Sequence, residues 1–224
     1  MLSTPARIFF ADIHCSLSGT TGISYKKESY FHFDPDFLEL PEDVYLEGYW
    51  QSAKYFKNLV GIIRREFTPR KELDASNEHI SEKTCESNAI SIHIRNGNYI
   101  ANPQTYNHHG LCPFEYYQMA IDCMVKNISN LYFYIFSDDP LWIKQNLIVN
   151  YPHTYATHNQ NIRYSLDLWL MSLSKHHIIV NSSFSWWGAW LCNNSEKMII
   201  APKKWFNASG INARDLIPDS WFKV

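Results

Sequence analysis

The chain has 224 residues, of which 46% are apolar, and it carries 20 Lys and Arg against 22 Asp and Glu. This length allows a sizeable core but is short for two full domains, so we expect about one and a half. The net charge of −2 argues against a dedicated nucleic-acid binder. The sequence contains no run of about 18 apolar residues, so it predicts no membrane span.

The N-terminal segment and the cysteines favour a reducing compartment. The apolar patch in residues 1–15 is interrupted by Asp12 and His14 and is too short for the core of a signal peptide. The 5 cysteines form no CxxC pair, so neither a disulfide framework nor a zinc site is expected. We expect a cytoplasmic protein, with peripheral association at the inner membrane left open.

The first third of the chain predicts few regular elements. Residues 44–46 are typical of a short strand. Residues 52–67 place apolar side chains at helical spacing and end in Arg64 and Arg65, where cations suit the helix dipole. The polar stretch 70–87 shows no periodicity, so we interpret residues 73–88 as a linker between two domains.

After this stretch, apolar runs and helical patterns alternate. The predicted strands are 89–94, 131–136, 177–180 and 198–201, and the predicted helices are 113–125, 165–173 and 183–192. This alternation favours an α/β fold with a parallel sheet built from βαβ units. In such sheets ligands bind beyond the carboxyl ends of the strands. The pair His108 and His109 lacks metal-ligand spacing, and we interpret it as part of a loop.

The end of the first of these strands carries His93 and Arg95 on the same side, because side chains alternate along a strand. Arginine matches phosphate well, since its planar fork donates two hydrogen bonds and keeps its charge. The alternative is a core histidine beside a surface arginine.

The end of the second strand reads Ser137-Asp138-Asp139-Pro140. Adjacent carboxylates can hold a divalent metal together with substrate phosphates, or accept hydrogen bonds from a sugar or a base. An aspartate before proline is equally typical of a helix N-cap. Both interpretations remain open from the sequence.

The end of the third strand passes into a helix through Ser182, Ser183 and Ser185. The free N–H groups of that helix start, with the hydroxyls around them, predict a cradle for a diphosphate. The alternative is an ordinary serine N-cap followed by tryptophans of the core, and both interpretations can hold together.

Asp167 lies in the first turn of the predicted helix 165–173. A carboxylate there usually pairs with the helix dipole. It could also accept two hydrogen bonds from the N1–H and N2 amino edge of guanine, which no cation can do.

Several segments resemble, in order and spacing, the motifs of α-1,2-fucosyltransferases of glycosyltransferase family 11 in their bacterial form. They are SIHIRNGNYI, HGLCPFEYYQMAI, YFYIFSDD, YSLDLWLMSLSKHHIIVNSSFSWWGAWL, PKKWF and LIPDSW, with FHFDPDFLELPEDVYLEGYWQSAKYF upstream. The resemblance covers roughly residues 25–221.

The resemblance implies a GT-B-like fold and transfer of L-fucose from GDP-L-fucose to the 2-hydroxyl of a galactoside, with inversion and without a metal or other cofactor. It implies that His93 and Asp167 hold the guanosine and that Arg95 binds the β-phosphate and is the catalytic residue. Around the diphosphate and fucose it places Ser183, Phe184 and Ser185, while Ser182 is a donor-binding candidate from the predicted helix start. Asp138 matches an acid of the same motifs, in a role left open.

Two departures from the family pattern stand out. The usual HxRRGDY segment has Asn96 in place of its second arginine and Asn98 in place of its aspartate, so both asparagines are candidate donor contacts. The family's GGLGNQMFQYA-like segment is absent. We therefore expect residues 1–72 to be the remnant of an N-terminal acceptor domain and residues 89–224 to be a complete GDP-fucose-binding domain.

Three functions remain open at this stage. The first is the inverting fucosyltransferase, a galactoside 2-α-L-fucosyltransferase acting on a glycan or a precursor of cell-surface polysaccharide. The second is a non-catalytic remnant that binds the donor weakly or not at all. The third is a GT-B enzyme that uses another nucleotide sugar.

Overall fold

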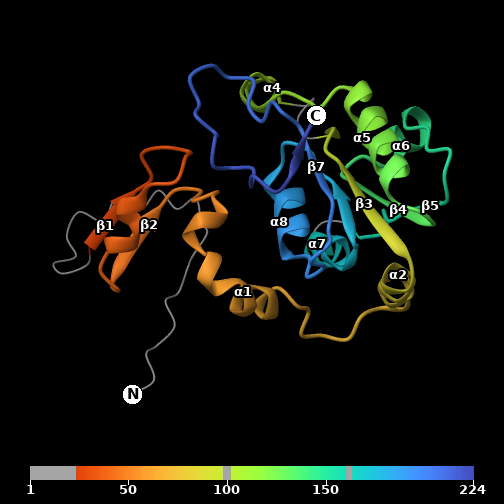
Figure 1. The fold of residues 1–224 in the computed structure, drawn as a ribbon, viewed down its shortest axis with the longest axis horizontal. Coiled ribbons are helices and arrows are strands. Elements are labelled where there is room, and N and C mark those ends of the chain that lie inside the picture. Colours follow the sequence, from red (N-terminus) through yellow and green to blue (C-terminus); the bar gives the residue numbers. More distant parts are fainter. Residues whose placement is uncertain (1–23, 98–101, 160–162) are drawn as a thin grey trace. The chain divides into compact units, whose positions relative to one another are not determined.

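The computed structural model describes residues 24–97, 102–159 and 163–224 (Figure 1). The predicted contact Asn98 lies outside these residues. The chain divides into two compact units, one of Met1–Asn58 with Ile211–Pro218 and one of Leu59–Gly210 with Asp219–Val224. The division therefore falls before the polar stretch that the sequence suggested as a linker.

The first unit contains a small parallel pair of strands, β1 (Ser24–Lys27) and β2 (Val44–Glu47), with the short 3₁₀ helices η1 (Pro35–Glu39) and η2 (Ala53–Tyr55). The strand predicted at 44–46 is confirmed. Trp50 packs edge-on against Tyr55, with 5.4 Å between ring centroids. Segment 211–218 belongs here because Asp215 accepts hydrogen bonds from the backbone N of Phe33 at 3.1 Å and, at its carbonyl, from Ser52 Oγ at 3.0 Å.

The single helix predicted over 52–67 is wrong in its first half. The chain forms η2, then η3 (Lys57–Leu59), and only then the α-helix α1 (Val60–Glu66). Phe56 interrupts the helix because its φ of −133° is not helical. Arg64, expected to serve its own helix, instead donates to the carbonyls of Leu191 at 2.9 Å and Cys192 at 2.8 Å.

The second unit is built on a six-stranded, fully parallel sheet in the order β5-β4-β3-β6-β7-β8. The strands are β3 (Asn88–Ile94), β4 (Leu131–Ser137), β5 (His153–Tyr155), β6 (His176–Ile178), β7 (Ile199–Ala201) and β8 (Phe222–Lys223). Counted from β3, this is the order 3-2-1-4-5-6 of doubly wound α/β sheets. The parallel sheet is confirmed, and the strand order reverses between β3 and β6.

Helices cover both faces of the sheet (Figure 1). Ile90, Ile92 and Ile94 of β3 pack in one cluster with α5 (Phe114–Asn127) and α6 (Pro140–Asn146). Ala89 of the same strand packs on the other face with residues of α2 (Ala75–Glu86) and α7 (Tyr164–Leu173). Because side chains alternate along a strand, His93 points to the α2 and α7 face.

Residues 73–88, which the sequence suggested as a linker, contain helix α2. Asp74 caps the helix by accepting from the backbone N of Asn77 at 3.1 Å. The helix buries Asn77, Ile80 and Thr84, and Ile80 packs with Leu170. Two of these three buried side chains are polar, so the apolar periodicity that identifies most amphipathic helices is missing.

The histidine pair that was interpreted as part of a loop lies in a helix, α4 (Pro103–His109). Asn102 caps it by accepting from the backbone N of Gln104 at 3.0 Å, and Pro103 occupies a first-turn position. Among the residues that the structure describes, no helix is long and apolar enough to cross a membrane.

Helix α8 (Ser183–Leu191) lies against α7, and two cations satisfy its C-terminal carbonyls. Besides Arg64 from α1, Lys197 donates to the carbonyls of Ala189 at 3.1 Å, Trp190 at 3.3 Å and Cys192 at 2.8 Å. At the opposite end, no side chain in the described part of the chain caps the helix, and the first turn contains no acidic residue.

We expect Gly188→Ala to destabilise the second unit. A Cβ at Gly188 would lie 3.0 Å from Met171 Cβ, and neither atom can rotate away because α7 and α8 hold both backbones. Overpacking of this kind costs about 1–3 kcal/mol. Urea unfolding measures it, with Gly61→Ala as the control because a Cβ at Gly61 meets nothing within 4 Å. Equal stability of both variants would contradict the close packing.

Candidate functional site

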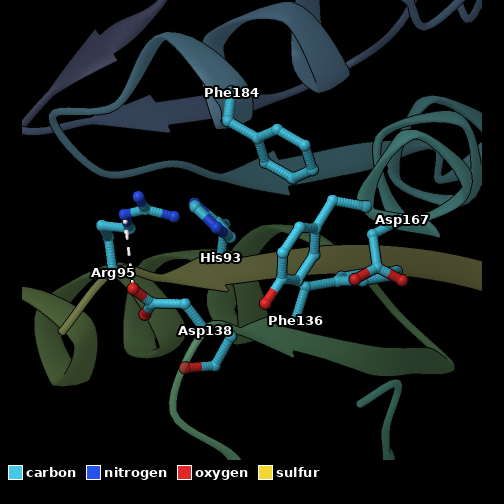
Figure 2. Close-up of a pocket in the computed structure, with 8 residues that line it drawn as sticks. His93, Arg95, Phe136, Asp138, Asp167 and Phe184 are labelled. Carbon is cyan, nitrogen blue, oxygen red and sulfur yellow. Dashed lines mark ion pairs between the residues drawn. The ribbon is translucent and has the colours of Figure 1, made fainter. Parts of the chain in front are cut away.

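A pocket of about 80 Å³ opens beyond the carboxyl ends of β3 and β4. It lies where the strand order reverses, the place at which open α/β sheets bind ligands. Most of its side chains come from strand ends or from the first turns of α7 and α8 (Figure 2). The lining residues are His93, Arg95, Phe136, Ser137, Asp138, Tyr164, Asp167 and Phe184.

Arg95 is held by Asp138, with 3.4 Å between Arg95 Nε and Asp138 Oδ2 (Figure 2). The other carboxylate oxygen, Oδ1, accepts from the backbone N of Asn96 at 2.9 Å and of Gly97 at 3.3 Å. Asp138 therefore fixes the chain that leaves β3 and orients the guanidinium at the pocket. This arrangement places Arg95 in the pocket wall.

Asp139 is an N-cap, as the alternative interpretation of the Asp138-Asp139 pair suggested. Its carboxylate accepts from the backbone N of Trp142 at 3.0 Å, at the start of α6. The two carboxylates thus serve different partners. Within the ranges that the structure describes, no group of three or more His, Cys, Asp or Glu side chains could hold a metal ion.

His93 is buried beside Phe184, with 5.3 Å between the ring centroids. Its Nδ1 has no hydrogen-bond partner among the described residues. Burial, and secondarily the positive charge of Arg95, lower the pKa of His93 from 6.5 to about 3. The imidazole is therefore neutral at pH 7 and can donate one hydrogen bond and accept another.

Burial of His93 predicts a loss of stability in acid. Its pKa is lower in the folded state, so the stability it contributes is full above pH 6.5 and is lost as the pH falls. At pH 5 the loss from this group is about 2 kcal/mol. We expect His93→Gln to lose less unfolding free energy than wild type between pH 7 and pH 5. Exposed His79→Gln is the control, and parallel losses in wild type and His93→Gln would contradict the assignment.

Asp167 turns from α7 toward the same pocket and is only 4% exposed (Figure 2). Burial raises its pKa from 3.8 to about 7, against the opposing effect of a hydrogen bond from Asn159. Asp167 is thus a buried carboxyl group in the pocket wall and not a solvated charge on the helix surface.

The structure does not bring all predicted contacts to the pocket wall. Ser182 and Ser183 begin α8 but do not line the pocket, and Phe184 of the same turn does. The side chain of Ser185 is fully buried, and its Oγ bonds to the backbone of Val180 at 3.3 Å and to the carbonyl of Ser182 at 3.1 Å. The hydroxyl of Ser185 therefore stabilises the turn and is not available to a ligand.

The predicted donor contact Asn96 is attached to the pocket through its backbone N, which donates to Asp138 Oδ1. Its side chain is buried, and Nδ2 has no hydrogen-bond partner among the residues described. Sequence reasoning missed three lining residues, Phe136, Ser137 and Tyr164. All three lie within three residues of Asp138 or Asp167, so their places in the motifs could have indicated them.

The parallel sheet and the pocket at its point of reversal are compatible with a Rossmann-like glycosyltransferase. The sequence of residues 23–223 matches the family described as Glycosyl transferase family 11. The chain belongs to this family, in agreement with the resemblance seen in its motifs.

Three curated proteins illustrate the relationship. The chain is 37% identical over 184 residues to an alpha-1,2-colitosyltransferase of Escherichia coli, covering 79% of this chain and 61% of the relative. It is 41% identical over 149 residues to the O-antigen biosynthesis glycosyltransferase WbnK of the same species, covering 65% and 48%. It is 25% identical over 179 residues to the galactoside 2-alpha-L-fucosyltransferase SEC1 of Bos taurus, covering 76% and 46%.

The chain thus spans less than two thirds of the length of each of these relatives, from 46% to 61%. Their names describe transferases of fucose or colitose and an enzyme of O-antigen biosynthesis.

Proposed function

We propose that the chain is an inverting glycosyltransferase that moves L-fucose from GDP-L-fucose to the 2-hydroxyl of a galactoside. The observation that carries the proposal is the pocket itself, in which a cation, a neutral imidazole and a buried carboxylate lie at the carboxyl edge of a doubly wound sheet. Family membership and the relative named galactoside 2-alpha-L-fucosyltransferase support this reaction.

In this reaction the oxygen of the acceptor hydroxyl forms a bond to the anomeric carbon of fucose. The bond from that carbon to the β-phosphate oxygen breaks, and its electron pair stays on GDP. The hydroxyl proton leaves to a base. Because negative charge develops on the leaving diphosphate, Arg95 and the uncapped N–H groups at the start of α8 are suited to stabilise it.

Asp167 and His93 bind different parts of the nucleoside in the proposed site. Asp167, as a carboxylate, accepts hydrogen bonds and suits the N1–H and N2 amino edge of guanine. His93 can bond the nucleoside through the Nδ1 atom that has no partner among the described residues. The proposed site uses no metal or other cofactor, so the charge of the diphosphate falls to Arg95 and the helix start.

The proposal also assigns roles to the two units. The second unit, with the pocket, binds the donor, and the first unit belongs to the acceptor-binding part of a GT-B-like arrangement. A glycan or a precursor of cell-surface polysaccharide is the proposed acceptor, and one relative acts in O-antigen biosynthesis by its name. Such a role suits a cytoplasmic protein that works at the inner membrane.

A second candidate donor is a colitose conjugate, because one relative that is 37% identical is named a colitosyltransferase. This candidate uses the same nucleotide pocket and differs only in the sugar.

Two measurements test the proposed function. Calorimetry with GDP and UDP tests the nucleotide, and we expect binding of GDP but not of UDP. Turnover of the GDP conjugates of L-fucose and colitose with a panel of β-galactosides tests the transfer. GDP binding without transfer to any acceptor would favour the donor-binding remnant, and UDP binding without GDP binding would favour another nucleotide sugar.

A further inference from the structure

We propose that Asn159, held in place by Asn77 of helix α2, is a positioning residue that orients Asp167 and favours its ionised form for recognition of the base. This inference rests on the proposed function, because it concerns the same pocket. Neither asparagine lines the pocket, so both act through Asp167.

The two asparagines form a reciprocal pair of amides. Asn77 Nδ2 donates to Asn159 Oδ1 at 3.0 Å, and Asn159 Nδ2 donates to Asn77 Oδ1 at 2.7 Å. Asn159 Nδ2 also donates to Asp167 Oδ1 at 2.8 Å. An amide nitrogen carries two hydrogens, so both hydrogens of Asn159 are used.

This pairing fixes which end of the Asn159 amide faces Asp167. With the amide turned around, its oxygen would face the oxygen of Asp167, which is tolerable only if the carboxyl is protonated. Asn77 and Asn159 are 0% and 2% exposed, so water cannot substitute for the lost partners, and breaking a buried polar pair is costly. The pair therefore favours the carboxylate over the carboxylic acid.

Further hydrogen bonds fix the position of Asn77. Asp74 accepts from Asn77 Nδ2 at 3.0 Å as well as from its backbone N, and it pairs with Arg163 at 2.9 Å. His158 Nε2 lies 3.0 Å from Asn77 Oδ1. The start of helix α2 is thus attached to the segments on both sides of residues 160–162, and through them to Asp167.

Ionisable side chains from several elements surround Asp167. His93 and Arg95 face the pocket from β3 and its end, Asp138 from the end of β4, and Tyr164 from the same helix as Asp167. Helix α8 contains no ionisable side chain. The ion pair of Asp74 and Arg163 and the imidazole of His158 lie farther out, beyond Asn77 and Asn159.

The pair leaves Asp167 able to bind a ligand. Oδ1 keeps a second lone pair, and Oδ2 accepts no hydrogen bond from any residue in the described part of the chain. Two acceptors in fixed positions suit two adjacent donors on one edge of a base, as in guanine.

The first experiment follows the ionisation of Asp167 without any ligand, by ¹³C NMR titration of its carboxyl group. In Asn159→Ala we expect the titration midpoint to rise by about one pH unit relative to wild type, the equivalent of one lost hydrogen bond. Asn77→Ser removes the amide that fixes Asn159 but keeps Asn159 itself, so we expect it to raise the midpoint of Asp167 by less. Exposed Asn146→Ala is the control and should leave the midpoint unchanged. An unchanged midpoint in Asn159→Ala and Asn77→Ser would overturn the proposal.

The second experiment measures GDP affinity by calorimetry between pH 5.5 and pH 8.5. Asp167→Asn gives the baseline: it removes the titration of residue 167, so its remaining pH dependence of GDP affinity comes from all other groups, including the β-phosphate. Relative to this baseline, Asn159→Ala should bind GDP about fivefold more weakly than wild type near pH 7 and recover most of the loss at pH 8.5. An equal loss at every pH would indicate a merely structural role and overturn the proposal.

The two experiments separate the inference from the proposed function. If wild type does not bind GDP, the proposed function fails, and the NMR titration still decides whether Asn159 controls Asp167. If GDP binds and the midpoint of Asn159→Ala does not move, the inference alone fails.

Discussion

Arg95→Ala is expected to weaken GDP binding by about 10- to 100-fold, the range for loss of a hydrogen bond to a charged group. Arg95 is the cation that lines the pocket, and Asp138 holds its guanidinium there. Since Arg95 contacts the diphosphate in the proposed site, guanosine binding should change little. Calorimetry with GDP and guanosine measures both effects. Turnover should fall further than affinity, because charge on the leaving group grows in the transition state.

Two further variants define this prediction. Arg95→Lys keeps the charge but loses the planar fork, so it should recover only part of the affinity. Arg70→Ala removes an exposed arginine that pairs with Glu66 on the surface, and it should bind GDP like wild type. Wild-type affinity in Arg95→Ala would refute the phosphate assignment.

Asp167→Asn is expected to lower affinity for GDP and for guanosine by a similar factor, about 10- to 100-fold. The amide has one acceptor oxygen in place of two, and its NH₂ group would face either the donors of the base or the NH₂ of Asn159, 2.8 Å from Asp167 Oδ1 in wild type. The pattern is opposite to that of Arg95→Ala, which spares guanosine. Competition between GDP and UDP measures the change in base preference.

The control for this variant is Asp122→Asn on α5, an exposed carboxylate that accepts from Gln118 at 3.0 Å. We expect it to leave both affinities unchanged. If Asp167→Asn kept full preference for GDP over UDP, Asp167 would not be the residue that reads the base.

Much of the second unit could be predicted from the sequence because its longer strands are rich in apolar residues. β3 and β4 are buried on both faces, so apolar side chains occur on both faces of each strand and the segments are easy to see, although β3 also contains Ser91 and His93. The polar residues just after them, Arg95 and Asp138, then follow from the rule that ligands bind at carboxyl ends. The short strands β5 and β8 have no such run and were not predicted.

Other features depend on contacts that the sequence does not show. Helix α2 was missed because its buried side is largely polar, and Asn77 is paired with a residue far along the chain. Ser185 has the same residue type as its neighbours Ser182 and Ser183, and only the three-dimensional turn shows that its hydroxyl bonds to backbone. Spacing alone could not separate these serines.

The two ends of helix α8 differ: positive side chains bind its C-terminal carbonyls, and the N–H groups at its N-terminus are available to an anion. Arg64 and Lys197 are bound to its last carbonyls, while its first turn contains no carboxylate and is capped by no side chain among the residues that the structure describes. In the proposed site the diphosphate of the donor is the missing N-terminal cap of this helix. Donor binding would then stabilise the start of α8, and through it the folded second unit, so the nucleotide should raise the melting temperature of the protein.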